Sequence, residues 1–365
     1  MLKKHSYLGV HVTHDASICQ VTGGEIDWFV EEERYSGIKH DRHPLTSVME
    51  VDISPDISKT IQVSGLYEPH NKDYLEDNAK FFTTILSKKY AKTISILDHE
   101  DIQYEFYELH HDFHAACGFY NSGFARAAVL VVDGMGNPLP HKKEVQEVET
   151  IYSCTYPNQF KKYSVGVTPT YLDAAKYDLS FGIGMVYQAL SNYFGFGDFG
   201  SGKLMGLSSY GVEDENIKPF VNDDFTLDTN LFYRSRFGLT FLPYEYVRYP
   251  KGVDNFMDLD DELKVKFSNL AYRVQKDFER YMSNLILKTL ERTGETNIVL
   301  TGGCALNCVA NYEYLKILPE GVRLYVEPIS TDAGTSIGLA KLDYYSATKS
   351  TSRHKLKTLY LGKER

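Results

Sequence analysis

Residues 7–33 read YLGVHVTHDASICQVTGGEIDWFVEEE, and this stretch decides the fold. Its apolar and β-branched residues predict three strands, at 7–12, 17–21 and 26–32. A polar turn at 13–17 separates the first two strands, and the paired glycines of 22–25 predict a hairpin turn between the last two. The chain therefore begins with a strand, a polar turn and a returning hairpin.

A second strand that runs into a polar turn begins at residue 127. Residues 127–132 are apolar, as in a strand buried inside a sheet, and the polar turn DGMGN follows at 133–137. Segment 138–178 is predicted to be irregular, with strand-like pieces near 149–155. The remaining elements that we expect are strands at 60–64, 298–301 and 324–327, helices at 73–91, 107–120, 180–194, 260–293 and 335–346, and a glycine-rich loop at 195–202.

A strand-and-turn unit that occurs twice predicts a duplicated α/β fold. Each half of an actin-like ATPase begins with a strand, a polar turn and a returning hairpin. We therefore expect the actin-like ATPase (ASKHA) fold, with two lobes and a central cleft. The 365 residues fit lobes at about 1–125 and about 126–350, and 351–365 is predicted to be a solvated, frayed tail.

Composition excludes several classes of protein. The formal net charge of −10 opposes binding to nucleic acid or to an anionic membrane surface. No run of about 18 apolar residues and no cleavable leader pattern occurs, so we expect a cytoplasmic protein without a membrane partner. The five cysteines are irregularly spaced, which argues against a disulfide framework, and Cys304 and Cys308 are interpreted as small packing residues.

Four residues form a candidate metal site. His110 and His114 are four apart on a predicted helix, so their side chains face the same way and can share an ion. Asp133 and Asp332 each follow a predicted strand at a glycine turn. Solvated histidines and turn-forming aspartates are the alternative for each residue alone, but two imidazoles with two carboxylates suit iron, manganese or zinc.

Glycine turns are the candidate nucleotide contacts. Gly302 and Gly303 follow a strand and precede Asn307, so backbone N–H groups there can approach a phosphate closely. The turns at Gly134 and Gly334 are similar. Lys203 lies beside glycines in GKLMGLSSYG, residues 202–211, and is either a phosphate ligand or a surface lysine on a mobile loop.

The first polar turn contributes a candidate catalytic histidine. His14 would lie near a ligand placed between the lobes, where it could act as a general base or cap the turn. The charged residues of 32–34 and 39–41 fit a solvated loop.

These motifs together resemble a known family. The sequences HDAS at 14–17, EERY at 32–35 with KHD at 39–41, HHDFHA at 110–115, DG at 133–134, GKLMGLSSYG at 202–211, GGCALNCVAN at 302–311 and DAG at 332–334 occur in one order. They resemble the amino-terminal domain of the O-carbamoyltransferases of nodulation-factor, cephalosporin and aminoglycoside biosynthesis. The resemblance covers nearly the whole chain.

The resemblance implies a chemistry and roles for particular residues. It implies transfer of a carbamoyl group from carbamoyl-adenylate, made from carbamoyl phosphate and ATP, to a hydroxyl group beside Fe²⁺ or another divalent metal such as Mn²⁺ or Zn²⁺. The implied metal ligands are His110, His114, Asp133 and Asp332. His14 would lie near the acceptor and accept its proton, and Lys39 near the nucleotide. The metal would polarise the carbamoyl carbonyl.

The chain departs from the family pattern in two places. Ser201 replaces a glutamate and Ser208-Ser209 replace Ala-Pro, which puts contacts from that loop in doubt. Family members also continue into a YrdC-like activating domain, whereas this chain ends soon after residues 359–362. We therefore expect no YrdC-like domain here, and either a separate activating protein as partner or a route that this domain performs alone.

The acceptor and two rival functions stay open at this point. The acceptor is a small-molecule alcohol or a hydroxymethylated pyrimidine, free or in DNA. One rival is a threonylcarbamoyl transferase acting on tRNA, which the histidine motifs and the acidity disfavour. The other is a non-catalytic nucleotide-binding regulatory subunit, which the full set of metal ligands disfavours. The oligomeric state is left open as well.

Overall fold

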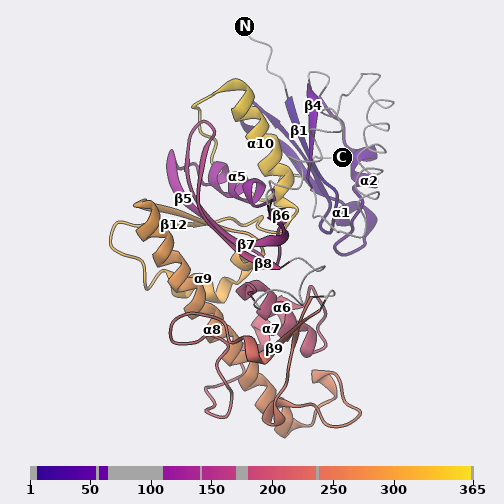
Figure 1. The fold of residues 1–365 in the computed structure, drawn as a ribbon. Helices are drawn as coiled ribbons and strands as arrows, with labels where there is room; N and C mark the ends of the chain where they lie inside the picture. Colours follow the sequence, from indigo (N-terminus) through magenta and orange to yellow (C-terminus); the bar gives the residue numbers. More distant parts are fainter. Residues whose placement is uncertain are drawn as a thin grey trace.

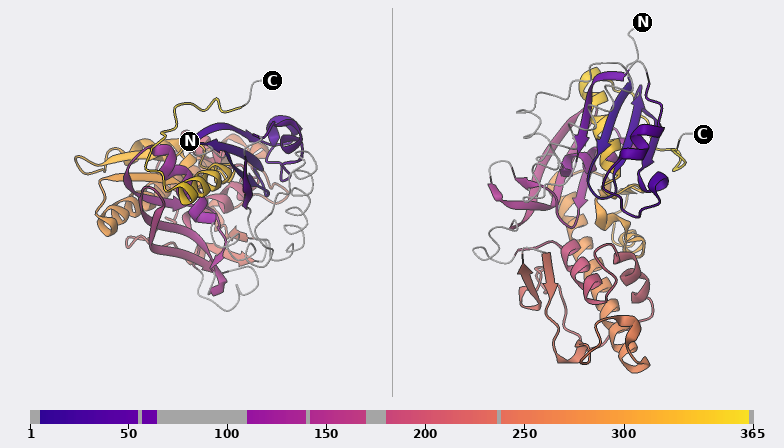
Figure 2. Two further views of the ribbon diagram at one scale, coloured as in Figure 1. Left: turned by 90° about the horizontal axis from the view of Figure 1, so that it is seen from above. Right: turned by 90° about the vertical axis from the view of Figure 1, so that its right-hand side faces the viewer.

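The computed structural model describes residues 6–54, 57–64, 110–139, 142–169, 180–235 and 238–362. The predicted helix at 73–91 lies outside these residues. Two β-sheets stand side by side with two helices between them, and a mainly helical part extends below the second sheet (Figures 1 and 2).

The first sheet contains the opening strands in the predicted arrangement. Its order is β3-β2-β1-β4. Strand β1 is antiparallel to β2 and parallel to β4, and β2 is antiparallel to β3. Gly23 and Gly24 have φ values of 64° and 91° in the β2–β3 turn, a conformation that glycine adopts without strain. The bounds are β1 Ser6–His11, β2 Ser17–Thr22, β3 Glu25–Glu31 and β4 Ile57–Ser64.

The second sheet repeats this arrangement. Strand β5 is antiparallel to β7 and parallel to β11, and β7 is antiparallel to β8, so the order β8-β7-β5-β11-β12 matches β3-β2-β1-β4 with one added strand. The predicted duplication is confirmed by this topology. The bounds are β5 Arg126–Val132, β6 Pro138–Leu139, β7 Lys142–Thr155, β8 Gln159–Pro169, β11 Asn297–Thr301 and β12 Arg323–Val326. Strands β7 and β8 show that the expectation of irregular structure over 138–178 was wrong for most of the segment.

Helices α5 (His110–Ser122) and α10 (Gly334–Thr348) fill the space between the sheets. Helix α10 packs against β1, β2 and β4, helix α5 packs against β5, β7, β11 and β12, and the two helices pack against each other. A Cβ atom at Gly9 would overlap the Ser336 carbonyl oxygen, and one at Gly338 would overlap the Phe113 carbonyl oxygen. These two glycines therefore allow α10 to lie against both β1 and α5.

Strand β5 separates two hydrophobic cores. Ala127, Val129 and Val131 belong to the core shared with α5 and α10, because alternate residues of a strand point to opposite faces. Ala128, Leu130 and Val132 point to the core shared with the lower helices. Both faces are buried, which explains the uninterrupted apolar run in the sequence.

The lower part is built on the long helix α8 (Asp261–Thr293). Its N-cap Asp260 accepts a hydrogen bond from Leu263 N at 2.8 Å. The other elements there are α6 Ile183–Tyr193, α7 Ser201–Ser208, α9 Cys308–Tyr314, the hairpin β9 Phe232–Ser235 with β10 Gly238–Phe241, and the 3₁₀ turns Thr229–Leu231, Glu245–Val247, Phe256–Asp258 and Gly303–Leu306.

Two short helices follow β3: α1 Glu33–Ser36 and α2 Leu45–Glu50. Glu32, expected to lie in a solvated loop, is buried instead. Its carboxylate accepts hydrogen bonds from the backbone N–H groups of Thr46 and Ser47 at 2.8 and 2.7 Å, so it anchors the start of α2.

The segment after α10 returns to the first sheet. Leu361 O accepts a hydrogen bond from Phe29 N, and Asn121 O accepts one from Leu356 N, each at 2.9 Å. Its side chains are largely exposed, but the described part of this tail is not frayed as expected.

All five cysteines are unpaired, and Cys308 is exposed rather than a packing residue. Among the described helices, none combines the length and the apolar character needed to cross a membrane.

Candidate metal centre and adjoining pocket

Three parallel strands of the second sheet end at the same edge. Strands β5, β11 and β12 are neighbours and run in one direction, so the segments that follow them meet. Asp133 follows β5 directly, and Asp332 lies in the turn between β12 and α10. Ligands bind at this edge of open α/β sheets.

Helix α5 brings the two histidines to the same place. Nε2 of His110 lies 3.3 Å from Asp133 Oδ2 and 3.7 Å from Asp332 Oδ1. Nε2 of His114 lies 3.8 Å from Asp133 Oδ2 and 3.4 Å from Asp332 Oδ1. The four residues predicted as metal ligands thus place one donor atom each within 4.8 Å of all the others.

This geometry fits a bound divalent cation. Tetrahedral ligands at about 2.1 Å from a metal are about 3.4 Å apart, close to the four separations above. Among the described residues, Nε2 of His114 and Oδ2 of Asp332 are buried and have no hydrogen-bond partner, so the site contains polar atoms that an ion could satisfy. The imidazole–carboxylate donor set suits iron, manganese or zinc.

The charges of the cluster favour its carboxylates in the ionised form. Burial alone would raise the pKa of Asp332, but His14, His110 and His114 outweigh it and hold the pKa well below its ordinary value. The pKa of Asp133 is lowered in the same way, against burial, by the hydrogen bond from His110. Ionised carboxylates are the form that ligates a metal.

A pocket of about 380 Å³ adjoins the cluster. It is lined from both repeats and by the lower helices, and most of its wall is apolar. Asp133 and Asp332 belong both to its lining and to the candidate metal cluster. The lining residues are His14, Asp15, His40, Asp133, Gly134, Met135, Gly184, Tyr187, Gln188, Asp198, Phe199, Ser201, Gly202, Met205, Phe278, Gly303, Cys304, Leu306, Asn307, Thr331 and Asp332.

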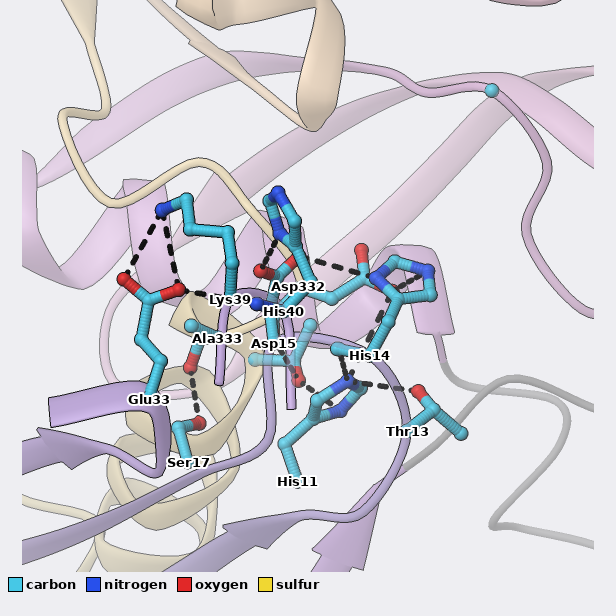
Figure 3. Close-up of polar contacts among 12 residues, drawn as sticks. His11, Thr13, His14, Asp15, Ser17, Glu33, Lys39, His40, Asp332 and Ala333 are labelled. Atoms are coloured by element: carbon cyan, nitrogen blue, oxygen red, sulfur yellow. Dashed lines mark hydrogen bonds and ion pairs between the residues drawn. The ribbon is translucent and has the colours of Figure 1, made fainter. Parts of the chain in front are cut away.

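His14 lies in this pocket next to the cluster (Figure 3). Its Nε2 is 3.4 Å from Asp332 Oδ2, and its Nδ1 is 3.1 Å from Asp15 Oδ2. Burial opposes the protonated ring, but the charges of Asp332 and Asp15 outweigh burial and raise the pKa of His14 to about 9. The β1–β2 turn therefore presents one ring nitrogen toward the predicted metal ligands.

His11 is a neighbour of this site that sequence reasoning missed. It is fully buried at the end of β1, hydrogen-bonded through Nε2 with Thr13 Oγ1 and through Nδ1 with Thr335 Oγ1, each at 2.9 Å. Burial lowers its pKa to about 4. These two hydrogen bonds connect the β1–β2 turn to the first turn of α10. The only available signal was a histidine at the polar end of an apolar strand.

The predicted glycine contacts divide into two groups. Gly134 and Gly303 line the pocket. Gly302 and Gly334 do not, and their role in packing is clear. A Cβ atom at Gly302 would overlap Val132 O, and one at Gly334 would overlap Ile329 O. Gly302 also has φ 87°, which disfavours other residues.

The remaining predicted contacts lie in different surroundings. Lys39 is 73% exposed and pairs with Glu33, its Nζ 3.1 Å from Oε1. Lys203 is exposed on helix α7, not on a loop, and like Lys39 it is outside the pocket lining. Asn307 lines the pocket, but its amide exchanges two hydrogen bonds with Gln275 and caps α9 through Ala310 N.

A solved structure of a known protein has a fold similar to that of this chain. Among solved structures, full-length HypF in its phosphate- and nucleotide-bound form matches with a TM-score of 0.50 and 13% identity over 96% of this chain and 57% of that chain. The repeated strand order and this match define the class as the duplicated actin-like ATPase fold.

The family is shown by sequence. The family profile described as Carbamoyltransferase N-terminus matches residues 68–341, and the chain belongs to this family. An uncharacterised Synechocystis protein, sll1178, is 27% identical over 90% of this chain and 55% of its own length. The nodulation protein NolNO of Sinorhizobium fredii is 27% identical over 69% of this chain and 33% of its own length. The chain thus spans about half or less of these relatives.

Proposed function

We propose that this protein is a metal-dependent O-carbamoyltransferase that moves a carbamoyl group from carbamoyl-adenylate to an acceptor hydroxyl. The observation that carries the proposal is the cluster of His110, His114, Asp133 and Asp332, whose two aspartates line a pocket that His14 also lines. Membership of the carbamoyltransferase family supports the class of reaction.

The four clustered residues would hold the cation, and the cation would supply Lewis-acid polarisation of the carbamoyl carbonyl. The acceptor oxygen attacks the carbamoyl carbon, and the bond from that carbon to the phosphate oxygen of the adenylate breaks. AMP leaves with the bonding pair, and the acceptor proton passes to Nε2 of His14. Gly134 and Gly303 line the same pocket and offer close backbone approach to the donor.

His14 must be neutral to accept a proton. With Asp332 uncompensated, the pKa of about 9 keeps the ring protonated at neutral pH. Asp332 makes the largest contribution that raises this pKa, and a cation bound to Asp332 would offset that charge. With a cation held by Asp332, His14 would be neutral more readily and could accept the acceptor proton.

The donor and acceptor are further parts of the proposal. ATP and carbamoyl phosphate would be the source of carbamoyl-adenylate, supplied by an activating partner or domain. The acceptor class is a small-molecule alcohol or a hydroxymethylated pyrimidine. The apolar wall formed by Met135, Met205, Phe278 and Leu306 supports a ligand with a flat or apolar face.

The test is a transfer assay with the purified protein loaded with Fe²⁺ without oxygen. One arm receives carbamoyl phosphate and ATP, a second receives prepared carbamoyl-adenylate, and both receive a panel of acceptors. We expect a product heavier by one carbamoyl group, and a loss of about 10²-fold or more in rate for His14→Ala. Metal content should be unchanged in that variant.

His43→Ala is the matched control, because His43 lies outside the pocket lining. Full turnover by His14→Ala would remove His14 from the mechanism. Transfer that persists after exhaustive chelation would rule out the metal, and no transfer to any acceptor from either donor would count against the function itself.

A further inference from the structure

A chain of hydrogen bonds runs away from His14 into the wall of the pocket (Figure 3). His14 Nδ1 lies 3.1 Å from Asp15 Oδ2, and His40 Nδ1 lies 2.7 Å from Asp15 Oδ1. Carboxylate oxygens only accept, so both ring nitrogens donate, one to each oxygen of the same carboxylate. The Nδ1 atom of His14 is thereby committed, and Nε2 is left facing Asp332 at 3.4 Å.

The backbone at Asp15 and His40 has an unusual conformation that neighbouring hydrogen bonds hold in place. Asp15 and His40 have φ values of 61° and 56°, in the left-handed region that non-glycine residues rarely occupy. The Ala16 N–H donates to Asp41 O at 2.9 Å, and the His40 N–H donates to Glu33 Oε2 at 3.2 Å. The β1–β2 turn and the α1–α2 loop are therefore joined through backbone as well as side chains. Residues in rare conformations that surrounding contacts enforce cluster at functional sites.

A residue from the lower helical part also holds His40. Phe199, in the loop between α6 and α7, stacks on the His40 ring with centroids 4.1 Å apart and planes 19° apart. Its ring is also 5.3 Å from that of His14. Gly195 and Gly197, with φ values of 76° and 79°, give this loop the turns that carry Phe199 to the site. Phe199 is 51% exposed, so this contact does not serve to bury the ring in a core.

We propose that Asp15 and His40 are positioning residues that fix the ring of His14 with Nε2 toward the reacting groups, and that Phe199 secures His40 by stacking on its ring. This inference rests on the role of His14 in the proposed function. A histidine whose second nitrogen has no fixed partner can rotate about its side-chain torsions, and a base that is misplaced by about 1 Å loses about 10²-fold in rate. The orienting carboxylate of a Ser-His-Asp triad acts on its histidine in the same way.

Substitutions at His40 can remove its hydrogen bond to Asp15 while keeping its positive φ. His40→Asn keeps an N–H donor near the position of Nδ1, and His40→Gly has none, while both residues tolerate a positive φ. We expect Asp15→Asn and His40→Gly to lower kcat by about tenfold or more, with KM changed less, and His40→Asn to lose less than His40→Gly. Phe199→Leu should lower kcat by a smaller factor. His43→Asn, in the same loop but outside the pocket lining, is the matched control and should match the wild type.

A second readout does not depend on activity. In the protein loaded with Zn²⁺ alone and labelled with ¹⁵N-histidine, we expect one sharp set of ring signals for His14. In Asp15→Asn and His40→Gly these signals should broaden or split, while the signals of His110 and His114 stay in place. A merely structural role would move all three sets or lower metal content.

The two readouts distinguish the inference from the proposed function. If the wild type transfers no carbamoyl group but the His14 signals change as expected, the function fails and the positioning stands. If the wild type is active and Asp15→Asn and His40→Gly retain kcat within about twofold, the inference is overturned. Unchanged His14 signals in both variants would overturn it too, whatever the activity.

Discussion

Two aspartates show how surroundings decide the behaviour of one residue type. Asp332 is surrounded by four histidines, His11, His14, His110 and His114, which outweigh burial and hold its pKa well below the ordinary value. Asp343, on α10, has a buried Oδ2 without a hydrogen-bond partner in the part of the chain that the structure describes, and burial raises its pKa to about 6. The charged form of Asp343 is therefore unfavourable in the folded protein, and this carboxylate is a source of instability rather than of function.

Asp343→Asn should stabilise the protein at pH 7 and above. The folded-state pKa is above the unfolded value of 3.8, so the folded state binds the extra proton and stability falls as pH rises from about 4 to about 6. The neutral amide removes this loss. We expect a gain of about 1 kcal/mol at pH 7 after allowing for solvent screening, and little gain at pH 4. Urea unfolding at the two pH values measures it, and an equal effect at both would contradict the assignment.

The histidine motif shows what spacing alone can and cannot predict. The interval of four brought His110 and His114 together, because side chains four apart share a helix face. The same motif contains His111, which points the other way, hydrogen-bonded through Nδ1 with Thr150 Oγ1 at 2.7 Å and next to Gly136. A strand-like piece was expected near 149–155, but nothing local in the sequence indicates that its Thr150 lies against His111.

At the scale of elements, the close approach of α5 and α10 supports the metal cluster. Helix α5 provides both histidines, and α10 begins two residues after Asp332. Gly338 permits their contact, since a Cβ atom there would overlap Phe113 O. The distance between the helices therefore sets the distance between the histidines and one of the carboxylates.

Gly338→Ala should push α10 away from α5. We expect a loss of about 1–3 kcal/mol in the free energy of unfolding, and weaker Zn²⁺ binding, because the cluster expands. Gly206→Ala is the matched control: Gly206 is exposed on α7, a Cβ atom there would meet nothing within 4 Å, and alanine should stabilise by up to about 1 kcal/mol. Denaturant unfolding and metal titration measure both variants. Tight Zn²⁺ binding by Gly338→Ala would show that the contact between α5 and α10 does not determine metal binding at the site.

Strands with clear hydrophobic patterns were predicted well, and the others were not. The three opening strands and β5, β11 and β12 have apolar residues that meet a core, so their period or continuity is visible. Strand β7 begins KKEVQEVE at Lys142, and β8 is mostly polar and partly exposed. Strand β7 is stabilised by pairing with β5 and β8, and β8 by pairing with β7. Pairing between separate strands leaves little trace in the hydrophobic pattern of the local sequence.

At the scale of the molecule, the candidate metal site connects segments far apart in the chain. His110 and His114 come from α5, Asp133 follows β5 and Asp332 precedes α10. A cation held by all four would bind the folded state and not the unfolded chain. Its binding free energy would therefore add to the stability of the fold.

Metal loading should raise the melting temperature. At free metal about 100 times the dissociation constant, the gain in unfolding free energy is about 2.7 kcal/mol. Thermal unfolding of the chelated protein, with and without added Fe²⁺, Mn²⁺ or Zn²⁺, measures the gain. Asp332→Asn should abolish most of it, whereas Asp52→Asn, at an exposed position, should not. Equal melting temperatures with and without every metal would contradict the site.

The position of Asp332 late in the chain also has a consequence for biosynthesis. A ribosome that has made residues 1–331 has produced both histidines and Asp133, but not the second carboxylate or the helix that lies against β1. The nascent polypeptide therefore cannot complete its ion site until Asp332 and helix α10 have left the exit tunnel. Capture of the ion by all four residues would follow the synthesis of Asp332, and it would mark a chain that has already closed its two halves around α10.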